Sequence, residues 1–93
     1  MLVVLLIWDP WNVAHNARHE VTPDEVEEVC HDDPMTSATY EGRLRVIGQT
    51  LAGRMLTVIL APRNGDGTYY TVTARSASRK ERRFYSESQG GNG

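Results

Sequence analysis

The sequence predicts an α+β domain in which helices pack on an antiparallel β-sheet. The chain has 93 residues, which is enough for one small core. Helix-start signals precede segments of helical periodicity in both halves of the chain. Four segments after residue 34 alternate apolar and polar residues as strands do. The expected order is β-α-α-β-β-β-β-α, with two helices in the N-terminal half and one at the C-terminal end.

The N-terminal segment is expected to form a strand and then a short helix. Residues 2–8 are mostly aliphatic or β-branched, which is typical of a covered strand. Residues 11–19 predict the helix, with Asp9 or Asn12 as its start signal. The apolar start has no basic segment before it and is shorter than a membrane span, so we expect a cytoplasmic protein and no contact with a membrane.

The second helix has the clearest start. Thr22 precedes Pro23, and Glu25 follows at the third helical position, which is a capping box with proline in the first turn. Its apolar face consists of Val26, Val29 and Cys30. Its other face is acidic, and we interpret it as a solvated surface, with docking of a basic partner as the alternative: Asp24, Glu25, Glu27 and Glu28.

The remaining elements follow from alternation and turn signals. The expected strands are residues 35–40, 43–50, 54–61 and 68–74. Their turns are marked by Leu51-Ala52-Gly53 and by Asn64-Gly65-Asp66-Gly67. A capping box of Ser78 and Glu81 opens a basic helix that runs to about Glu87. We expect one domain over residues 1–87 and a disordered tail over residues 88–93.

Charge is divided unevenly along the chain. The net charge is −2, but residues 1–40 carry eight acids and one base, and residues 41–93 carry nine bases and four acids. Nine of the ten bases are arginine, whose guanidinium suits bidentate recognition of phosphate. The overall acidity argues against a general nucleic-acid binder, whereas the basic second half permits a local anion site.

Cysteine and histidine give no support for a metal site or a thiol nucleophile. Cys30 is the single cysteine, which suits a reducing compartment, and we interpret it as a small buried residue. His15 and His19 share a helix face, but no HExxH or paired CxxC supplies further ligands. We therefore interpret both histidines as solvent-facing and expect neither a metal ion nor another cofactor.

The arginines are the candidates for phosphate chemistry. Arg75 and Arg79 flank the start of the last helix, where free backbone N–H groups and the helix dipole attract anions. Arg54 and Arg63 lie at the two ends of one expected strand. The distance between Arg63 and Arg75 stays open at this point, and an ordinary arginine surface is an equal alternative.

Two tryptophans flank the turn before the first helix. Trp8 and Trp11 are each either core residues or platforms on which a base stacks, and the core is the more common use of tryptophan. Phe84 and Tyr85 in the last helix are expected to pack on the sheet.

Short motifs occur along the chain in a fixed order. They are Trp8-Asp9-Pro10, Asn16, Arg18-His19-Glu20-Val21, Asp32-Asp33-Pro34, Arg43 to Gly48, Gly53-Arg54, Thr73-Ala74-Arg75-Ser76-Ala77, Glu81-Arg82 and Tyr85. Their order and spacing over residues 7–87 resemble the BrnT family of toxins. The resemblance implies a RelE-like fold, a ribonuclease toxin of a type II toxin–antitoxin module, and neutralisation by a ribbon-helix-helix antitoxin similar to BrnA.

Three positions depart from the family pattern. The family has lysine where this chain has Arg18, glycine where it has Glu20, and serine where it has Thr73. Arg18 keeps the positive charge but cannot act as a general base at neutral pH. These differences leave it open whether this chain is active.

The resemblance implies a metal-independent cleavage in which arginines stabilise the charge on the phosphate. We expect Arg75 and Arg63 to clamp it, with Arg79 and Arg54 assisting. His19 is the candidate for proton transfer, because imidazole titrates near neutral pH. Further contacts with RNA are expected from Arg18, Arg54, Trp8 and Arg82.

Two other functions remain open. One is a catalytically inactive relative that only binds its antitoxin, and the other is a small interaction domain without any role in RNA binding. For an active toxin, the expected partners are mRNA, the antitoxin and, as a complex of toxin and antitoxin, operator DNA. Whether cleavage requires the ribosome stays open.

Overall fold

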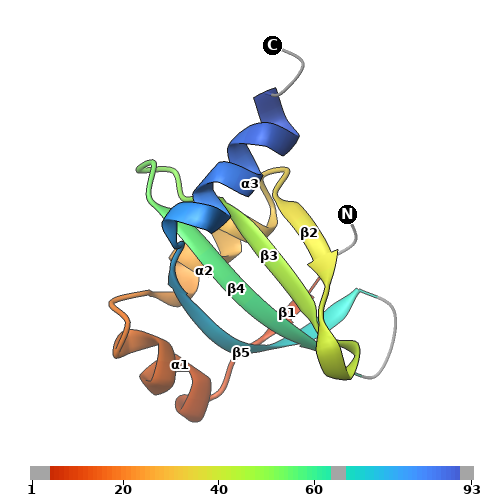
Figure 1. Ribbon diagram of the computed structural model, residues 1–93. Coiled ribbons are helices and arrows are strands. Elements are labelled where there is room, and N and C mark those ends of the chain that lie inside the picture. Colours follow the sequence, from red (N-terminus) through yellow and green to blue (C-terminus); the bar gives the residue numbers. More distant parts are fainter. Residues whose placement is uncertain (1–4, 64–66, 91–93) are drawn as a thin grey trace.

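The computed structural model describes residues 5–63 and 67–90 (Figure 1). Its elements are β1 (Leu5–Ile7), α1 (Pro10–Ala17), α2 (Pro23–Cys30), β2 (Met35–Ala38), the 3-10 turn η1 (Tyr40–Gly42), β3 (Leu44–Gln49), β4 (Met55–Pro62), β5 (Thr68–Ser76) and α3 (Arg79–Gly90). The predicted α+β class and the predicted order of helices and strands are both confirmed. The predicted turn at residues 64–66 lies outside the described residues.

The strands form one sheet in the order β1-β5-β4-β3-β2. β2, β3, β4 and β5 pair antiparallel, as expected, whereas β1 runs parallel to β5. A hairpin forces neighbouring strands to be antiparallel, but α1, α2 and three strands separate β1 from β5 along the chain. β1 is therefore free to enter the sheet in the same direction as β5.

The predicted helix starts are present as capping boxes. In α1 the cap is Asp9, whose carboxylate accepts from the Asn12 amide at 2.9 Å, while the Asn12 side chain accepts from the Asp9 amide at 2.9 Å. In α2 the Thr22 hydroxyl accepts from the Glu25 amide at 3.2 Å, and the Glu25 carboxylate accepts from the Thr22 amide at 3.0 Å. Each box satisfies backbone donors that the first helical turn leaves free.

The core lies between α2 and one face of the sheet. The expected alternation is confirmed, because Val46, Leu56, Val58 and Leu60 are fully buried there beside Val26 and Val29 of α2. Gly48 lets the helix approach closely, since a Cβ atom there would lie 3.2 Å from Val29 Cγ1 and 3.1 Å from Pro34 Cβ. α3 packs on the opposite face, where Arg45 stands over the ring of Phe84.

Three acids of α2 hold other segments in place. Glu25 pairs with Arg54, Glu27 accepts a hydrogen bond from the indole of Trp8 at 2.9 Å, and Glu28 accepts one from the Leu51 amide at 3.0 Å. This face is thus more than the solvated surface that the sequence suggested. It joins α2 to the start of α1 and to the turn between β3 and β4.

The last helix is longer than the sequence predicts. α3 continues to Gly90, so residues 88–90 belong to it rather than to a tail. The hydroxyl of Ser88 donates to the Tyr85 carbonyl at 3.1 Å, which satisfies an acceptor within the last turns. Within the described ranges, no helix has the length and apolar character needed to cross a membrane.

Candidate active site

The C-terminal half of β5 contacts α1 and leads along the chain into α3. Among the described residues, β1 pairs with β5 from Thr68 to Tyr70, and α1 covers the next part of this edge. Two buried asparagines of α1 take the place of a strand. Asn12 Nδ2 donates to the Thr71 carbonyl at 3.1 Å, and Asn16 Oδ1 accepts from the Ala74 amide at 2.9 Å. These bonds fix α1 beside the strand that carries Arg75.

Arg75 points to the α3 side of the sheet and forms a two-point ion pair with Glu81. Nη1 lies 2.8 Å from Oε1, and Nη2 lies 2.9 Å from Oε2. The geometry is the fork-on-carboxylate arrangement that fixes a guanidinium most firmly. The arginine side chain is still 44% exposed, whereas that of Glu81 is 11% exposed. Arg75 therefore presents a positioned positive charge to solvent.

Glu81 is the hub of this arrangement. Besides Arg75, its Oε1 accepts from the Thr57 hydroxyl at 2.9 Å and from the Ser78 amide at 2.8 Å. The Ser78 hydroxyl accepts from the Glu81 amide, so the predicted capping box of α3 is confirmed. The hydrogen bonds from Arg75 lower the pKa of Glu81 to about 2, although burial opposes this effect. The same contact raises the pKa of Arg75, so the pair is ionised at neutral pH.

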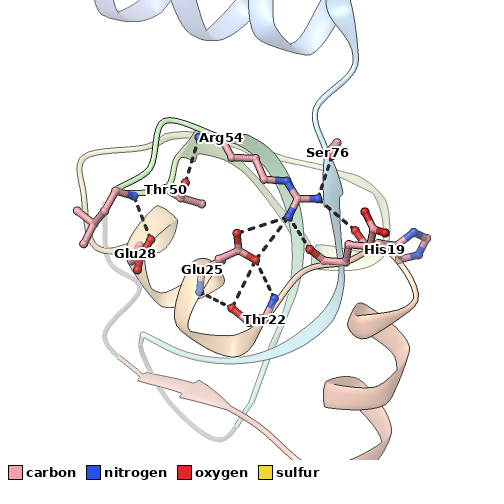
Figure 2. A network of polar contacts seen from close by, with 9 residues as sticks. His19, Thr22, Glu25, Glu28, Thr50, Arg54 and Ser76 are labelled. Atoms are coloured by element: carbon pink, nitrogen blue, oxygen red, sulfur yellow. Dashed lines mark hydrogen bonds and ion pairs between the residues drawn. The ribbon is translucent and has the colours of Figure 1, made fainter.

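Arg54 is held by a second polar network (Figure 2). Its Nη1 donates to the Glu20 carbonyl and pairs with Glu25, while Nη2 donates to the His19 carbonyl at 3.2 Å and to the Ser76 hydroxyl at 3.1 Å. The guanidinium thus ties the loop between α1 and α2 to the end of β5. Arg54 serves the fold in this structure, and the RNA contact expected for it has less support.

The Arg54 network also brings His19 close to the end of β5. The same nitrogen of Arg54 binds the His19 carbonyl and the hydroxyl of Ser76, the residue after Arg75. The imidazole of His19 points away from the Arg54 guanidinium, and the residue is exposed. The backbones of His19 and Arg75 are therefore on neighbouring segments, although the side chains of Ser76 and Arg75 point to opposite faces of β5.

Arg63 lies at the other end of the sheet. In the pairing of β4 with β5, Arg75 is opposite Thr57, whereas Arg63 follows Pro62, which is opposite Tyr69. Arg63 is six positions from Thr57 along the chain, which corresponds to about 20 Å in an extended strand. The Arg63 guanidinium instead stands 4.9 Å from the centre of the Tyr70 ring, whose hydroxyl donates to Asp9. In this structure Arg63 and Arg75 are thus held by different partners at opposite ends of the sheet, which does not support the predicted clamp on a single phosphate.

The two tryptophans have different environments. Trp8 is half-buried, packs against the core and donates to Glu27. Trp11 is 59% exposed and stacks in parallel on His15, with 4.8 Å between ring centroids. The base-stacking role expected for Trp8 therefore has less support than the same role for Trp11.

His15 also lies beside the candidate site, and sequence reasoning did not include it. Its Nε2 lies 3.3 Å from the hydroxyl of Thr73, two residues before Arg75 on the same side of β5. Trp11, His15 and His19 are spaced by four residues, which was the available signal, but the sequence suggested for His15 only a metal ligand or a solvent-facing residue.

The other predicted site residues are exposed. Arg18 lies at the end of α1, and Arg79 and Arg82 lie in the first turns of α3. Among the described residues, no group of three or more His, Cys, Asp or Glu side chains could hold a metal ion. Burial raises the pKa of the Cys30 thiol to about 12, which excludes a thiolate at neutral pH.

Comparisons with known proteins identify the family of the chain and agree with its fold. A family model described as "Ribonuclease toxin, BrnT, of type II toxin-antitoxin system" matches residues 8–81. The crystal structure of the Brucella abortus ribonuclease toxin BrnT is similar, with a TM-score of 0.63 and 27% sequence identity, over 81% of this chain and 97% of that one. Curated protein sequences give no match.

Proposed function

Because the chain belongs to the BrnT family of ribonuclease toxins of type II toxin–antitoxin systems, we propose that it is an endoribonuclease that cuts RNA without a metal ion. Cleavage would inhibit translation in the cytoplasm, and a cognate antitoxin would neutralise it. The observation that carries the proposal is the ion pair that holds the half-exposed Arg75 between β5 and the start of α3. A charge fixed in advance is the main requirement for stabilising a phosphorane transition state.

The chemistry follows from the 2′-hydroxyl of RNA. That hydroxyl loses its proton and attacks the neighbouring phosphorus, the bond to the 5′-oxygen breaks, and that oxygen takes up a proton. The products are a 2′,3′-cyclic phosphate and a 5′-hydroxyl. DNA lacks the attacking group and is expected to be spared.

We assign the roles from the surroundings of each side chain. Arg75 neutralises the charge that gathers on the phosphoryl oxygens, and the exposed Arg79 assists at the N-terminus of α3. His19 transfers protons, since its imidazole is exposed and its backbone lies near the end of β5. Arg63, about 20 Å from Arg75 along the strands, contacts a different phosphate of the RNA. Arg18 and Arg82 contribute further contacts to the RNA backbone.

The test is to induce the chain alone in bacteria and to follow growth and total RNA. We expect growth arrest with loss of RNA, abolished by Arg75→Ala. A matched control is Arg43→Ala, since Arg43 is a half-exposed arginine with an acidic partner, Glu41, beside the far strands of the sheet. Purified protein should cut RNA in the presence of a chelator. Cleavage of DNA by the purified protein would contradict the mechanism.

A catalytically inactive, antitoxin-binding protein is the second candidate. It is favoured because both terminal nitrogens of Arg75 already donate to Glu81, and the guanidinium of Arg54 already donates to Glu25 and Ser76. Normal growth on induction, with soluble protein and retained binding of a ribbon-helix-helix antitoxin, would establish this function. Binding of operator DNA by the complex is compatible with either candidate and does not distinguish them.

A further inference from the structure

One face of α1 carries a row of rings that the core does not bury. Trp11 and His15 are parallel to within 8°, and the edge of His19 meets His15 with 5.6 Å between ring centroids. The indole of Trp11 is 59% exposed although it takes part in this stack. A large apolar ring held rigidly at the surface is a typical platform for a nucleobase.

A basic side chain borders the rings. A shallow pocket of about 130 Å³ is lined by Trp11, Ala14, His15 and Arg18. The segment from Pro10 to His19 contains no acid, although Asp9 and the exposed Glu20 flank it. The pocket thus combines a ring for stacking with a guanidinium for the backbone.

The row of rings is continuous with the candidate active site. His15 reaches Thr73 of β5, and Arg75 lies two residues further on the same side of that strand. His19, at the other end of the row, is tied through Arg54 to Ser76. A strand of RNA with its phosphate at Arg75 therefore has a direct route over α1.

We propose that the α1 face formed by Trp11, His15 and Arg18 is a subsite for the single-stranded RNA next to the scissile phosphate. One base stacks on Trp11, His15 holds the indole in place from its other side, and Arg18 contacts the adjoining phosphate. Binding through stacking is tolerant of base identity. The inference rests on the proposed ribonuclease function and adds the part of the protein that holds the substrate.

The probe is a short fluorescent single-stranded oligonucleotide of mixed sequence with 2′-O-methyl groups. It lacks the attacking hydroxyl, so binding is measured by anisotropy on the otherwise unaltered protein without cleavage. Trp11→Ala should raise the Kd by roughly 5- to 150-fold, the loss of one stacked base, and Trp11→Phe should raise it less. Arg18→Ala should lower the salt dependence of log Kd by about one phosphate contact.

The controls are matched in chemistry. Tyr40→Ala removes an aromatic ring that is 79% exposed in η1, beside the far strand β2, and Arg43→Ala removes an arginine from the same region. Neither should change the Kd. Thermal unfolding of each variant shows whether it is folded, and an exposed residue such as Trp11 should tolerate replacement.

Cleavage of unmodified RNA by the original chain is measured in parallel. If Trp11→Ala leaves the Kd unchanged while the original chain cuts RNA, the subsite is wrong and the ribonuclease function stands. Weaker binding of the antitoxin with unchanged RNA affinity would assign this face to the protein partner and overturn the inference. If the chain neither binds nor cuts RNA, both the subsite and the proposed ribonuclease function are wrong.

Discussion

Arg75 and Glu81 form a two-point ion pair that joins the end of β5 to the first turn of α3, with N–O distances of 2.8 and 2.9 Å. The carboxylate is nearly buried and also accepts hydrogen bonds from Thr57 and from the Ser78 amide. The pair therefore supports both the attachment of α3 and the position of the charge that we assign to the phosphate. Two predictions concern these two residues.

The ion pair should make stability depend on pH in the acid range. The pKa of Glu81 falls from 4.5 to about 2 on folding, so its contribution is complete above about pH 4.5 and is lost as the pH falls towards 2. That contribution is on the order of 3 kcal/mol. In Glu81→Gln, urea unfolding should show a lower stability at neutral pH and a weaker loss on acidification. Glu87→Gln, at an exposed position of α3, should behave as the original chain does.

Arg75→Lys should separate charge from geometry. An ammonium keeps the charge but cannot bind both oxygens of Glu81 in parallel, so its position is not fixed. We expect the rate of RNA cleavage to fall at least about 100-fold, as for the loss of one positioned donor. Arg43→Lys is the matched control. Full activity of Arg75→Lys would mean that charge alone is sufficient.

Glu20→Gly should stabilise the protein. Glu20 follows α1 with a φ of 59°, a left-handed conformation that costs a residue with a Cβ about 1 kcal/mol. Its amide donates to the Ala17 carbonyl, and the next amide, of Val21, donates to the Asn16 carbonyl, which closes the helix end. Chemical denaturation should show a gain of about 0.5–1 kcal/mol.

The control for Glu20→Gly is a glycine placed within the helix. Ala14 is exposed in α1, and Ala14→Gly should destabilise by about 1 kcal/mol. A loss of stability in both variants would show that the left-handed conformation is not what matters at position 20.

Asn16→Ala should weaken the edge of β5. Removing the side chain leaves the Ala74 amide buried without its acceptor, which costs roughly 1–3 kcal/mol. Hydrogen exchange should accelerate at the Ala74 amide more than at Val58, which lies in the interior of β4. If the Ala74 amide exchanges equally slowly in Asn16→Ala and in the original chain, α1 does not act as a substitute strand.

The sequence was sufficient where the signal is local. The capping boxes at Thr22 and Ser78 predicted two helix starts, and Asp9 was one of two start signals considered for α1, because such signals depend on residues within one turn. Alternation of apolar and polar residues predicted that residues 43–50 and 54–61 form strands, because side chains of a strand point alternately to its two faces. The family motifs also carried over, since their order along the chain is itself a property of the sequence.

Only the tertiary structure decided which of these residues meet. The parallel pairing of β1 with β5 depends on the path of the whole chain, and the register of β4 with β5 separates Arg63 from Arg75. Arg54 donates hydrogen bonds to the carbonyls of Glu20 and His19, which precede it in the chain by 34 and 35 residues. The sequence by itself therefore determined the elements and their order, which arise from neighbours along the chain. The site was decided by packing, because its members come from segments that only the folded sheet brings together.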